Sequence, residues 1–537
     1  AALDIGAKVE ADQVQAGHGD SERRRVCSHR LPHRLRCPTP EVPLRRFLLL
    51  PLLFPLTAQA RPDCRTGELR QRVAFANAGE DDRPTSVGYV DSELYPIRVH
   101  YRREGDMARA INIILPSAEK AWRIEVEEMG WPSPASDGTL GGDDRFDYYL
   151  TNEETYGGAW TWGPPTDVVA DDGWFSVAAF VALDDTQIAN ADMDDFVSHE
   201  FNHALQYTID GVEVTFFVWE STAEAMEELV VPDTDLYFMD IPYFQKLPFG
   251  SILFSGYDDE IVAYDRYSLY EYGGSIVGLY LEEAYGQRDG TTLLQLWLNL
   301  AQGTRASEPD YIDALGMVAA DTPYEDIYLG LAEWRMFVHT DDDGAHYQEG
   351  GAWGKSSMVA TEGSLALSAV SGTSVSPVDA PYDLGTSYWA IDVDDAEGGS
   401  LKLKVEGADG LQWGLVAAAW QEGAPATVIR QRAGVGEPVE ATLDLTGATR
   451  VMVGVANLGA PDLNAEGRHA RADFSLSFER VLEEEQEDSD PVAADDTGAP
   501  VKEDPAACGC AAAPPTSLAV LGVLGLLAGR RRRFSQA

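Results

Sequence analysis

Cysteine is scarce in this chain of 537 residues, and its five cysteines avoid the central part. Cys27 and Cys37 lie near the N-terminus, Cys508 and Cys510 lie near the C-terminus, and Cys64 stands alone between the pairs. A disulfide framework therefore cannot hold the body of the chain together. We expect hydrophobic cores or a bound metal to provide its stability.

Positive charge is also scarce. Lys and Arg number 40 against 89 Asp and Glu, which gives a formal net charge of −49. Such a surface repels nucleic-acid phosphates, so we exclude DNA and RNA as partners. The acidity suits a soluble secreted protein or one that binds cations.

The N-terminal region has the pattern of a targeting segment and not that of a folded domain. The run RRFLLLPLLFPLTAQA, residues 45–60, has two arginines, an apolar stretch and an Ala-Gln-Ala cleavage site, so we assign residues 44–60 to a signal peptide. Residues 1–43 have no apolar period, and the first methionine is Met107. Our hypothesis is that they are a gene-model artefact or disordered, with translation starting at a non-AUG codon such as that of Val42 or Leu44.

The C-terminal residues 508–537 combine Cys508-Gly-Cys510, a short apolar run and four arginines. With its Ala/Pro flank, the run approaches the roughly 20 residues of a membrane span, and the arginines mark a cytoplasmic end. The segment resembles the MYXO-CTERM sorting segments of myxobacterial surface proteins. That resemblance implies a membrane anchor until processing near the cysteines, and an outer-surface or extracellular location afterwards.

The hydrophobic period of the body changes once, near Gly350. Before it, residues 117–131 have a helical period, and residues 145–151 and 174–183 read as strands. Further helical patterns occupy Asp195–Tyr207, Glu220–Val230, Tyr267–Tyr285, Thr291–Ala301, Tyr311–Ala320 and Tyr324–His339. This order predicts an α+β domain over residues 61–345.

After Gly350 the apolar residues recur at every second position. Such runs occupy residues 400–407, 450–458 and 471–481. Separated by Gly, Pro and Asp turns, they predict an all-β antiparallel sandwich domain over residues 355–482. Residues 483–507 have almost no large apolar side chains and read as an acidic disordered linker.

Histidine is the third scarce residue type, yet two of the nine histidines stand four residues apart in VSHEFNHALQY, residues 197–207. On a helix, His199 and His203 lie on one face and can present imidazole nitrogens to one ion. Glu200 can then take a proton from a water on that ion. Chance gives on the order of 0.01 such His-Glu-x-x-His patterns in a chain of this composition. We therefore favour a zinc site over an exposed polar helix.

A catalytic zinc takes three protein ligands and keeps one position open. In WESTAEAMEELV, Glu220, Glu224 and Glu227 form one helical stripe whose mutual repulsion a nearby cation would remove. We predict Glu220 as the third ligand and Glu224 as the acceptor of a hydrogen bond from a ligand imidazole. The alternative, that these glutamates are a solvated face of an acidic protein, stays open.

The two motifs together resemble those of the gluzincin-type metallopeptidases. A closer resemblance is to secreted metalloproteases of the myxobacterial kind, with HEF-x-H-x-x-Q followed by E-x-T-A-x-x-M-E. It extends to FDYYL with its following Tyr-Gly, residues 146–157, and to YEYGGSIVGLYLEEAYG, residues 270–286. The chain departs from the pattern at Ala225, where these proteins often have a bulky aromatic residue, and this departure bears on the substrate cleft.

The resemblance implies a zincin-like fold for the α+β domain. It also implies that His199, His203 and Glu220 bind one catalytic Zn²⁺ and that Glu200 is the general base. We therefore expect a secreted, surface-anchored, monomeric zinc endopeptidase that cleaves a protein or peptide substrate. Zinc would activate the water and polarise the scissile carbonyl, while Glu200 would pass the water's proton to the leaving amine.

A further donor should stabilise the oxyanion of this reaction. Tyr272 is our candidate catalytic residue, and Tyr267, Tyr270 and His339 are competitors. For each tyrosine, packing is the competing role.

Two alternatives to the peptidase stay open. One is a non-catalytic surface binding protein with a degenerate peptidase domain, and the other is a zinc hydrolase with a non-peptide substrate. A Ca²⁺ cofactor has no support from a motif, because the acidic clusters Asp192–Asp195 and Asp341–Asp343 lack the spacing of a calcium loop.

Overall fold

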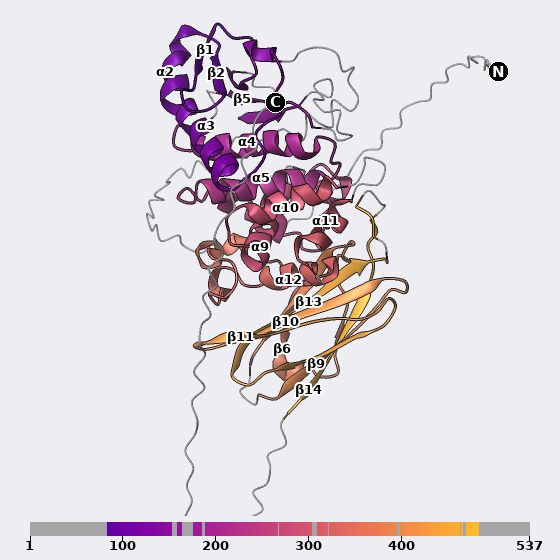
Figure 1. Ribbon diagram of the computed structural model, residues 1–537. Coiled ribbons are helices and arrows are strands. Elements are labelled where there is room, and N and C mark those ends of the chain that lie inside the picture. The colour runs from indigo at the N-terminus through magenta and orange to yellow at the C-terminus, as the bar shows by residue number, and fades with distance from the viewer. Residues whose placement is uncertain are drawn as a thin grey trace, which may run out of the picture. The chain divides into compact units, whose positions relative to one another are not determined.

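The computed structural model describes residues 83–482, apart from 153–157, 164–175, 185–187, 267, 303–308, 321, 395–397, 462 and 466–468. The expected signal peptide, acidic linker and sorting segment lie outside the described residues, as do residues 1–43. Helices and a mixed sheet come first, and a β-rich region follows (Figure 1). The predicted α+β organisation with a β-rich C-terminal region is confirmed.

The first sheet has the strand order β1-β2-β3-β5-β4. Its strands are β1 (Gly88–Asp91), β2 (Ile97–Tyr101), β3 (Phe146–Thr151), β4 (Ala159–Trp162) and β5 (Phe180–Asp184). Strands β2, β3 and β5 run parallel, whereas β1 and β4 are antiparallel to their neighbours. Strand β4 is therefore an edge of the described sheet that runs against the strand beside it.

The two strand predictions for this sheet had different outcomes. The strand expected at residues 145–151 is confirmed as β3, which is buried along its whole length. The strand expected at residues 174–183 is confirmed over its second part, where β5 pairs with the sheet, and residues 174 and 175 lie outside the described residues. Val177 instead donates its backbone N–H to the carbonyl of Tyr207 at the end of a helix, so the chain there packs on that helix.

Most of the expected helical patterns are confirmed with shifted ends, but the helix expected over Tyr267–Tyr285 is broken in two, and that expected over Tyr324–His339 ends at Trp334. The α-helices are α2 (Met107–Arg109), α3 (Leu115–Ala121), α4 (Met193–Asp210), α5 (Phe216–Val230), α6 (Ile241–Gln245), α7 (Asp259–Val262), α8 (Tyr270–Gly273), α9 (Ser275–Tyr285), α10 (Thr291–Leu300), α11 (Tyr311–Val318) and α12 (Tyr324–Trp334). The helix expected over residues 117–131 is α3 continued by a π-helical segment, Trp122–Glu128. No helix among the described residues has both the length and the apolarity that membrane crossing requires.

The helix expected over Tyr267–Tyr285 is broken into α8 and α9 at Gly274. A Cβ atom on Gly274 would lie only 2.4 Å from the ring of Phe217 on α5. Glycine thus lets the break pack closely against α5. The consequence is that Tyr272, two residues before the break, is held beside the α4–α5 pair.

The C-terminal region is a sandwich of two sheets, with strand orders β11-β10-β13-β8-β6 and β12-β9-β14-β7. The strands are β6 (Gly363–Ala366), β7 (Ser374–Val375), β8 (Gly385–Asp392), β9 (Ser400–Gly407), β10 (Gln412–Gln421), β11 (Ala424–Arg432), β12 (Val439–Asp444), β13 (Ala448–Gly459) and β14 (Phe474–Val481). Side chains from both sheets, such as Leu403, Leu415 and Phe478, share one apolar core.

The prediction of an all-antiparallel sandwich is wrong at one pair of strands. Strand β6 pairs with β8 in parallel. This pairing is possible because the chain leaves β6, contributes β7 to the other sheet, and only then returns as β8. Such a crossover brings the chain back in the same direction.

The five-stranded sheet of the sandwich also packs on the helices. Helix α12 lies against its strands β10 and β13 (Figure 1). Leu384, Tyr388 and Val416 belong to the same apolar core as α9, α11 and α12. The Tyr388 hydroxyl donates to the carbonyl of Ala332 at 2.8 Å, in the last turns of α12. The helical region and the sandwich therefore share a core.

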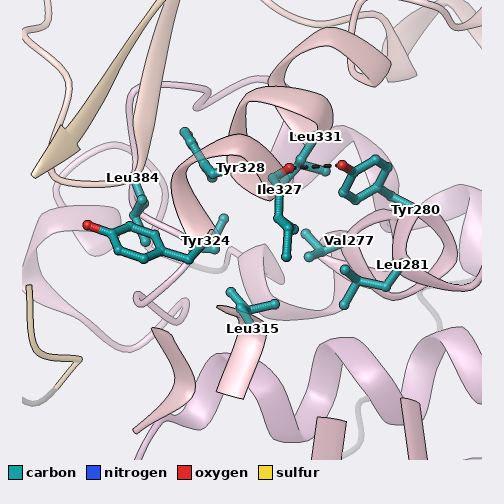
Figure 2. Close-up of a pocket in the computed structure, with 10 residues that line it drawn as sticks. Val277, Tyr280, Leu281, Leu315, Tyr324, Ile327, Tyr328, Leu331 and Leu384 are labelled. Atoms are coloured by element: carbon teal, nitrogen blue, oxygen red, sulfur yellow. Dashed lines mark hydrogen bonds between the residues drawn. The ribbon is translucent and has the colours of Figure 1, made fainter. Parts of the chain in front are cut away.

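A small cavity of about 10 Å³ lies between α9, α11 and α12, where Val277, Leu315 and Leu331 line it (Figure 2). Its volume is roughly that of a single water position, and its lining is mostly apolar. The Tyr280 hydroxyl at its wall already donates to the carbonyl of Ile327. We interpret the cavity as a packing void and not as a binding site.

Candidate metal centre

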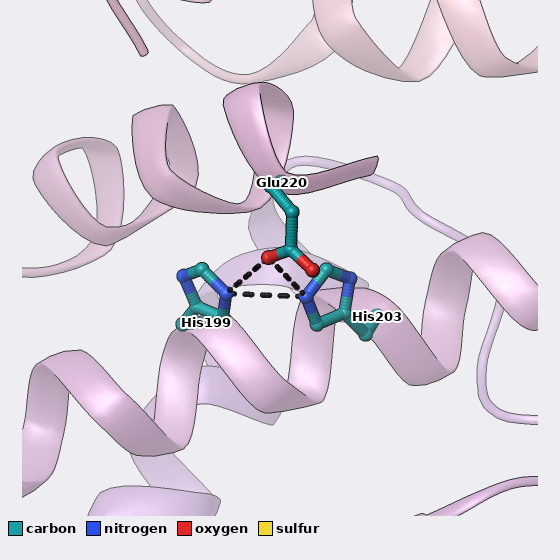
Figure 3. A group of neighbouring side chains, drawn as sticks. All are labelled: His199, His203 and Glu220. Atoms are coloured by element: carbon teal, nitrogen blue, oxygen red, sulfur yellow. Dashed lines mark hydrogen bonds and ion pairs between the residues drawn. The ribbon is translucent and has the colours of Figure 1, made fainter. Parts of the chain in front are cut away.

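Helices α4 and α5 pack side by side and bring the predicted zinc ligands together. His199 and His203 are one turn apart on α4, and Glu220 lies opposite them on α5 (Figure 3). The Nε2 atoms of the two histidines are 3.1 Å apart. Oε2 of Glu220 is 3.3 Å from Nε2 of His199 and 3.2 Å from Nε2 of His203.

These separations match the geometry of a zinc ion. Zinc–nitrogen and zinc–oxygen bonds of about 2.0–2.1 Å in a tetrahedral arrangement hold two ligand atoms roughly 3.3 Å apart. All three distances between the ligand atoms lie at or just below this value. Three protein ligands leave one tetrahedral position for water or substrate.

The tautomer of His203 is set by Gln206. Nδ1 of His203 lies 2.7 Å from Oε1 of Gln206. The amide nitrogen of Gln206 donates to Asn202 at 2.8 Å and to Thr222 at 3.0 Å, so its oxygen is turned toward the imidazole. Nδ1 of His203 therefore carries the proton, and Nε2 presents its lone pair to the other ligands.

Two carboxylates lie beside the other nitrogen of His199. Its Nδ1 atom is 2.8 Å from Oε1 of Glu227 and 3.4 Å from Oε2 of Glu224. The negative charges favour a proton on Nδ1, which leaves the Nε2 lone pair for a metal. The structure thus brings the predicted Glu224 to the ligand imidazole, with Glu227 closer still.

Three electron-pair donors consequently meet at one point. Burial alone would raise the pKa of Glu220, but positive charge on the imidazoles of His203 and His199, and their hydrogen bonds, outweigh burial and hold this pKa below its usual range. The carboxylate therefore stays charged. Two imidazole lone pairs and a carboxylate at contact distance repel one another unless a cation or proton lies among them, and this donor set is one that zinc prefers.

The stripe of glutamates on α5 is not a solvated face. Glu220, Glu224 and Glu227 have exposed fractions of 0%, 0% and 2%. The alternative interpretation of these residues as surface charge is wrong, because α4 and its histidines cover them. Burying three carboxylates is costly unless positive groups compensate them.

The expected general base, Glu200, is buried next to strand β4. The Thr161 hydroxyl on β4 lies 2.7 Å from Oε2 of Glu200 and 2.7 Å from its backbone carbonyl. It can donate its proton to one of these oxygens at a time. The contact fixes the carboxylate against the antiparallel edge strand. The two residues are 39 positions apart in the sequence, which gave no signal of the contact.

Of the oxyanion candidates, Tyr272 lies nearest to the predicted ligands among the described residues. Its ring stacks on that of His199, with the centroids 6.0 Å apart and the planes 13° apart. Tyr270 donates its hydroxyl to the carbonyl of Ser251 at 3.1 Å and is a core residue. His339 pairs through Nδ1 with the carbonyl of Trp353 at 3.0 Å. The fourth candidate, Tyr267, lies outside the described residues.

A second layer of polar residues, which was not predicted from the sequence, supports α4. Asn202 donates to Oε2 of Glu125, on the π-helical segment, at 3.0 Å. Burial raises the pKa of Glu125 well above its usual value, and it also raises that of Tyr148. The positions of Asn202 and Gln206, four residues apart on the histidine helix, were the available signal. Nothing in the sequence linked Glu125 to them.

Residues of the acidic clusters named in the sequence pair with basic side chains from other segments of the chain. Asp194 accepts a hydrogen bond from Lys120 at 3.0 Å. Asp341 forms an ion pair with Arg450 of the sandwich. Neither cluster supplies a group of three convergent metal-ligand atoms within the described part of the chain.

Comparisons with known proteins show no family for this chain. No family model matches the chain, and no curated protein matches it. Similar solved structures include the pre-peptidase C-terminal domain of collagenase from Bacillus anthracis, at 13% identity over 22% of this chain and 96% of that one, with a TM-score of 0.15.

Two further solved structures have the same level of similarity. They are the mitogen derived from Yersinia pseudotuberculosis (12% identity, 22% of this chain, 93% of that one, TM-score 0.15) and a periplasmic inhibitor of g-type lysozyme from Aeromonas hydrophila (10%, 22%, 99%, 0.13). At these TM-scores the likenesses carry no argument about fold or function.

Proposed function

We propose that the chain is a zincin-like, zinc-dependent endopeptidase. One observation carries the proposal: Nε2 of His199, Nε2 of His203 and Oε2 of Glu220 converge at 3.1–3.3 Å, with Glu200 on the same helix. Secretion and surface anchoring are part of the proposal and rest on the sequence alone.

A zinc ion bound by these residues would polarise a carbonyl and acidify a water. Glu200 would take the proton of the attacking water and pass it to the leaving amine. The Thr161 hydroxyl would hold the carboxylate of Glu200 in place through its hydrogen bond to Oε2. Tyr272, stacked beside His199, would supply the donor to the developing oxyanion.

The position of β4 supports a peptide as the substrate. In the described sheet, β4 is an edge strand, and its Thr161 contacts Glu200. An extended peptide can add as a further strand at the edge of a sheet. A peptide bound along β4 would therefore place its backbone near the general base.

The burial of the site favours a second candidate, a non-catalytic protein in which the zinc is structural. His199, Glu200 and His203 have exposed fractions of 2%, 0% and 0%. A structural zinc is closed to solvent, whereas a catalytic zinc must admit substrate. The sandwich would then carry the binding function.

Metal content is the first test. The full chain, purified without chelator, should contain one zinc per molecule, and Glu220→Ala should contain almost none. Glu271→Gln is the matched control, since Glu271 is a buried glutamate near Glu220 with no ligand role. A well-folded parent without zinc would overturn the proposal.

Cleavage by the Glu200→Gln variant then separates the two candidates. The variant should keep its zinc while its cleavage of a protein substrate falls by at least about 100-fold, because only the general base is lost. Zinc in the parent combined with no cleavage of any peptide mixture would favour the structural role.

A further inference from the structure

A second group of acidic side chains lies toward the C-terminal end of α5. Glu228, Asp235 and Glu349 each contribute one carboxylate oxygen, and these three oxygens lie within 4.8 Å of one another. Glu228 is on α5, Asp235 precedes the 3-10 turn Leu236–Met239, and Glu349 precedes another at Gly350–Ala352. Three separate stretches of chain therefore converge here, independently of the proposed zinc centre.

The charge at this point is only partly compensated. Arg288 donates through Nη2 to Oε1 of Glu228 at 2.6 Å and to Oε2 of Glu349 at 3.1 Å. Its Nε atom also lies 3.4 Å from Glu283. One guanidinium thus stands against four carboxylates, counting Asp235, which is exposed.

The buried end of the cluster has an oxygen that lacks a donor. Oε2 of Glu228 is buried and has no hydrogen-bond partner, while the whole side chain is 1% exposed. The carboxyl of Glu349 faces Glu228, and burial together with this neighbour raises the pKa of Glu228 to about 8. Two facing carboxylates need a proton or a cation between them. The unpartnered oxygen is the feature that points to a ligand.

We propose that Glu228, Asp235 and Glu349 bind a divalent cation of the calcium type. All candidate ligands are oxygens, as calcium requires, and calcium–oxygen bonds of about 2.3–2.6 Å place ligand atoms up to roughly 5 Å apart. Waters at the exposed Asp235 side would complete the six to eight ligands. The cation would tie together α5, which carries Glu220, and the two loops.

Terbium luminescence tests the site directly, because Tb³⁺ replaces calcium and is excited by nearby aromatic rings. The Tyr237 hydroxyl donates to Glu349 at 2.8 Å, and the Trp353 indole donates to Tyr237 at 3.2 Å. The full chain, with zinc present, should give saturable Tb³⁺ emission on excitation of these rings. Ca²⁺ should displace it, and millimolar Mg²⁺ should not.

Variants decide whether the emission comes from this cluster. Glu228→Gln and Asp235→Asn should each weaken Tb³⁺ and Ca²⁺ binding at least tenfold. Ca²⁺ should raise the unfolding temperature of the parent and of the control below, but not that of these two variants. Asp233→Asn is the matched control, since it removes a neighbouring charge that is outside the cluster. Equal affinity in all four proteins would mean adventitious binding to surface acids and would overturn the proposal, as would an absence of saturable emission.

Asp235→Asn also guards against a folding artefact. Asp235 is exposed, so its substitution leaves the core intact, whereas Glu228 is buried. Zinc content should stay unchanged in every variant, which separates this site from the candidate zinc centre. Loss of Tb³⁺ binding in Glu228→Gln alone, with Asp235→Asn like the parent, would reduce the site to fewer ligands than calcium requires and contradict the proposal.

Discussion

Helix α5 and strand β9 are both central to their regions, but they bury opposite kinds of side chain. Helix α5 buries Glu220, Glu224, Glu227 and Glu228 at exposed fractions of 0–2%. Strand β9 alternates strictly, with apolar residues such as Leu403 facing the sandwich core and its lysines outside. Helix α5 thus buries charged groups, whereas β9 buries apolar groups and leaves its charges outside.

The difference lies in what compensates a buried charge. A buried carboxylate loses its hydration, which costs several kcal/mol unless hydrogen bonds, cations or imidazoles replace the water. On α5 the histidines of α4 and Arg288 do this in part. The sandwich core needs no compensation. We infer that α4 and α5 were shaped by a site and the sandwich core by stability.

The largest expected effect concerns whether the two regions are separable at all. Residues 61–345 expressed alone should show no cooperative urea unfolding, because Leu384, Tyr388 and Val416 of the sandwich complete their apolar core. Each such side chain contributes about 1.5–3 kcal/mol by burial, against a total stability of about 5–15 kcal/mol.

The sandwich alone, residues 355–482, is the control fragment. It keeps its inter-sheet core, which is distinct from the shared one, so it should unfold cooperatively. Tryptophan fluorescence against urea concentration measures both fragments. A sharp transition in residues 61–345 would show that the helical region is self-sufficient.

A core substitution in the sandwich should destabilise the fold without changing the zinc content. Leu403→Ala removes a buried side chain between the sheets and should lower the free energy of unfolding by about 2–5 kcal/mol. Zinc content of the folded full chain should not change. Lys402→Ala, on the outer face of the same strand, should shift stability by less than about 0.5 kcal/mol. Loss of zinc in Leu403→Ala would contradict the division of roles.

Removing the charge beside His199 should weaken zinc binding without a large loss of folding stability. Glu227→Gln should lower zinc affinity by about 10–100-fold, since partners of a ligand imidazole fix its tautomer and raise its basicity. Glu224→Gln should have the smaller effect, because Glu224 is 3.4 Å from Nδ1 and Glu227 is 2.8 Å from it. Competition with a chromophoric chelator measures both affinities. A larger loss of affinity in Glu224→Gln than in Glu227→Gln would mean that Glu224 is the main partner of the His199 imidazole.

The smallest effect is a pH dependence from Glu271. Burial, with the neighbouring charge of Glu220, raises the pKa of Glu271 to about 8 in the folded chain. Between about pH 4.5 and 8 the folded state keeps a proton that the unfolded state releases, so stability falls as pH rises. The slope is at most about 1.4 kcal/mol per pH unit.

The Glu271→Gln variant isolates that slope. Its free energy of unfolding, measured in urea at pH 5, 6, 7 and 8, should fall less steeply than that of the parent. Both proteins should be saturated with zinc, so that the proposed ligands contribute equally. Identical slopes would place the titration on another group.

Much of the candidate site was readable because its geometry is local. The four-residue spacing of His199 and His203 places them on one helical face whatever surrounds the helix. The stripe from Glu220 to Glu227 is equally local. The strand positions failed where pairing partners decide: the run before β5 bonds to the end of α4, and β6 pairs in parallel with β8.

The sequence by itself determined the elements and the identity of the chemical groups, since helical and strand periods depend on neighbours in the chain. Only the tertiary structure decided which groups meet. The approach of Glu220 to both histidines, the hydrogen bond of Thr161 to Glu200, and the facing of Glu228 with Glu349 are contacts between distant segments. Such contacts follow from how the core packs, and no local period encodes them.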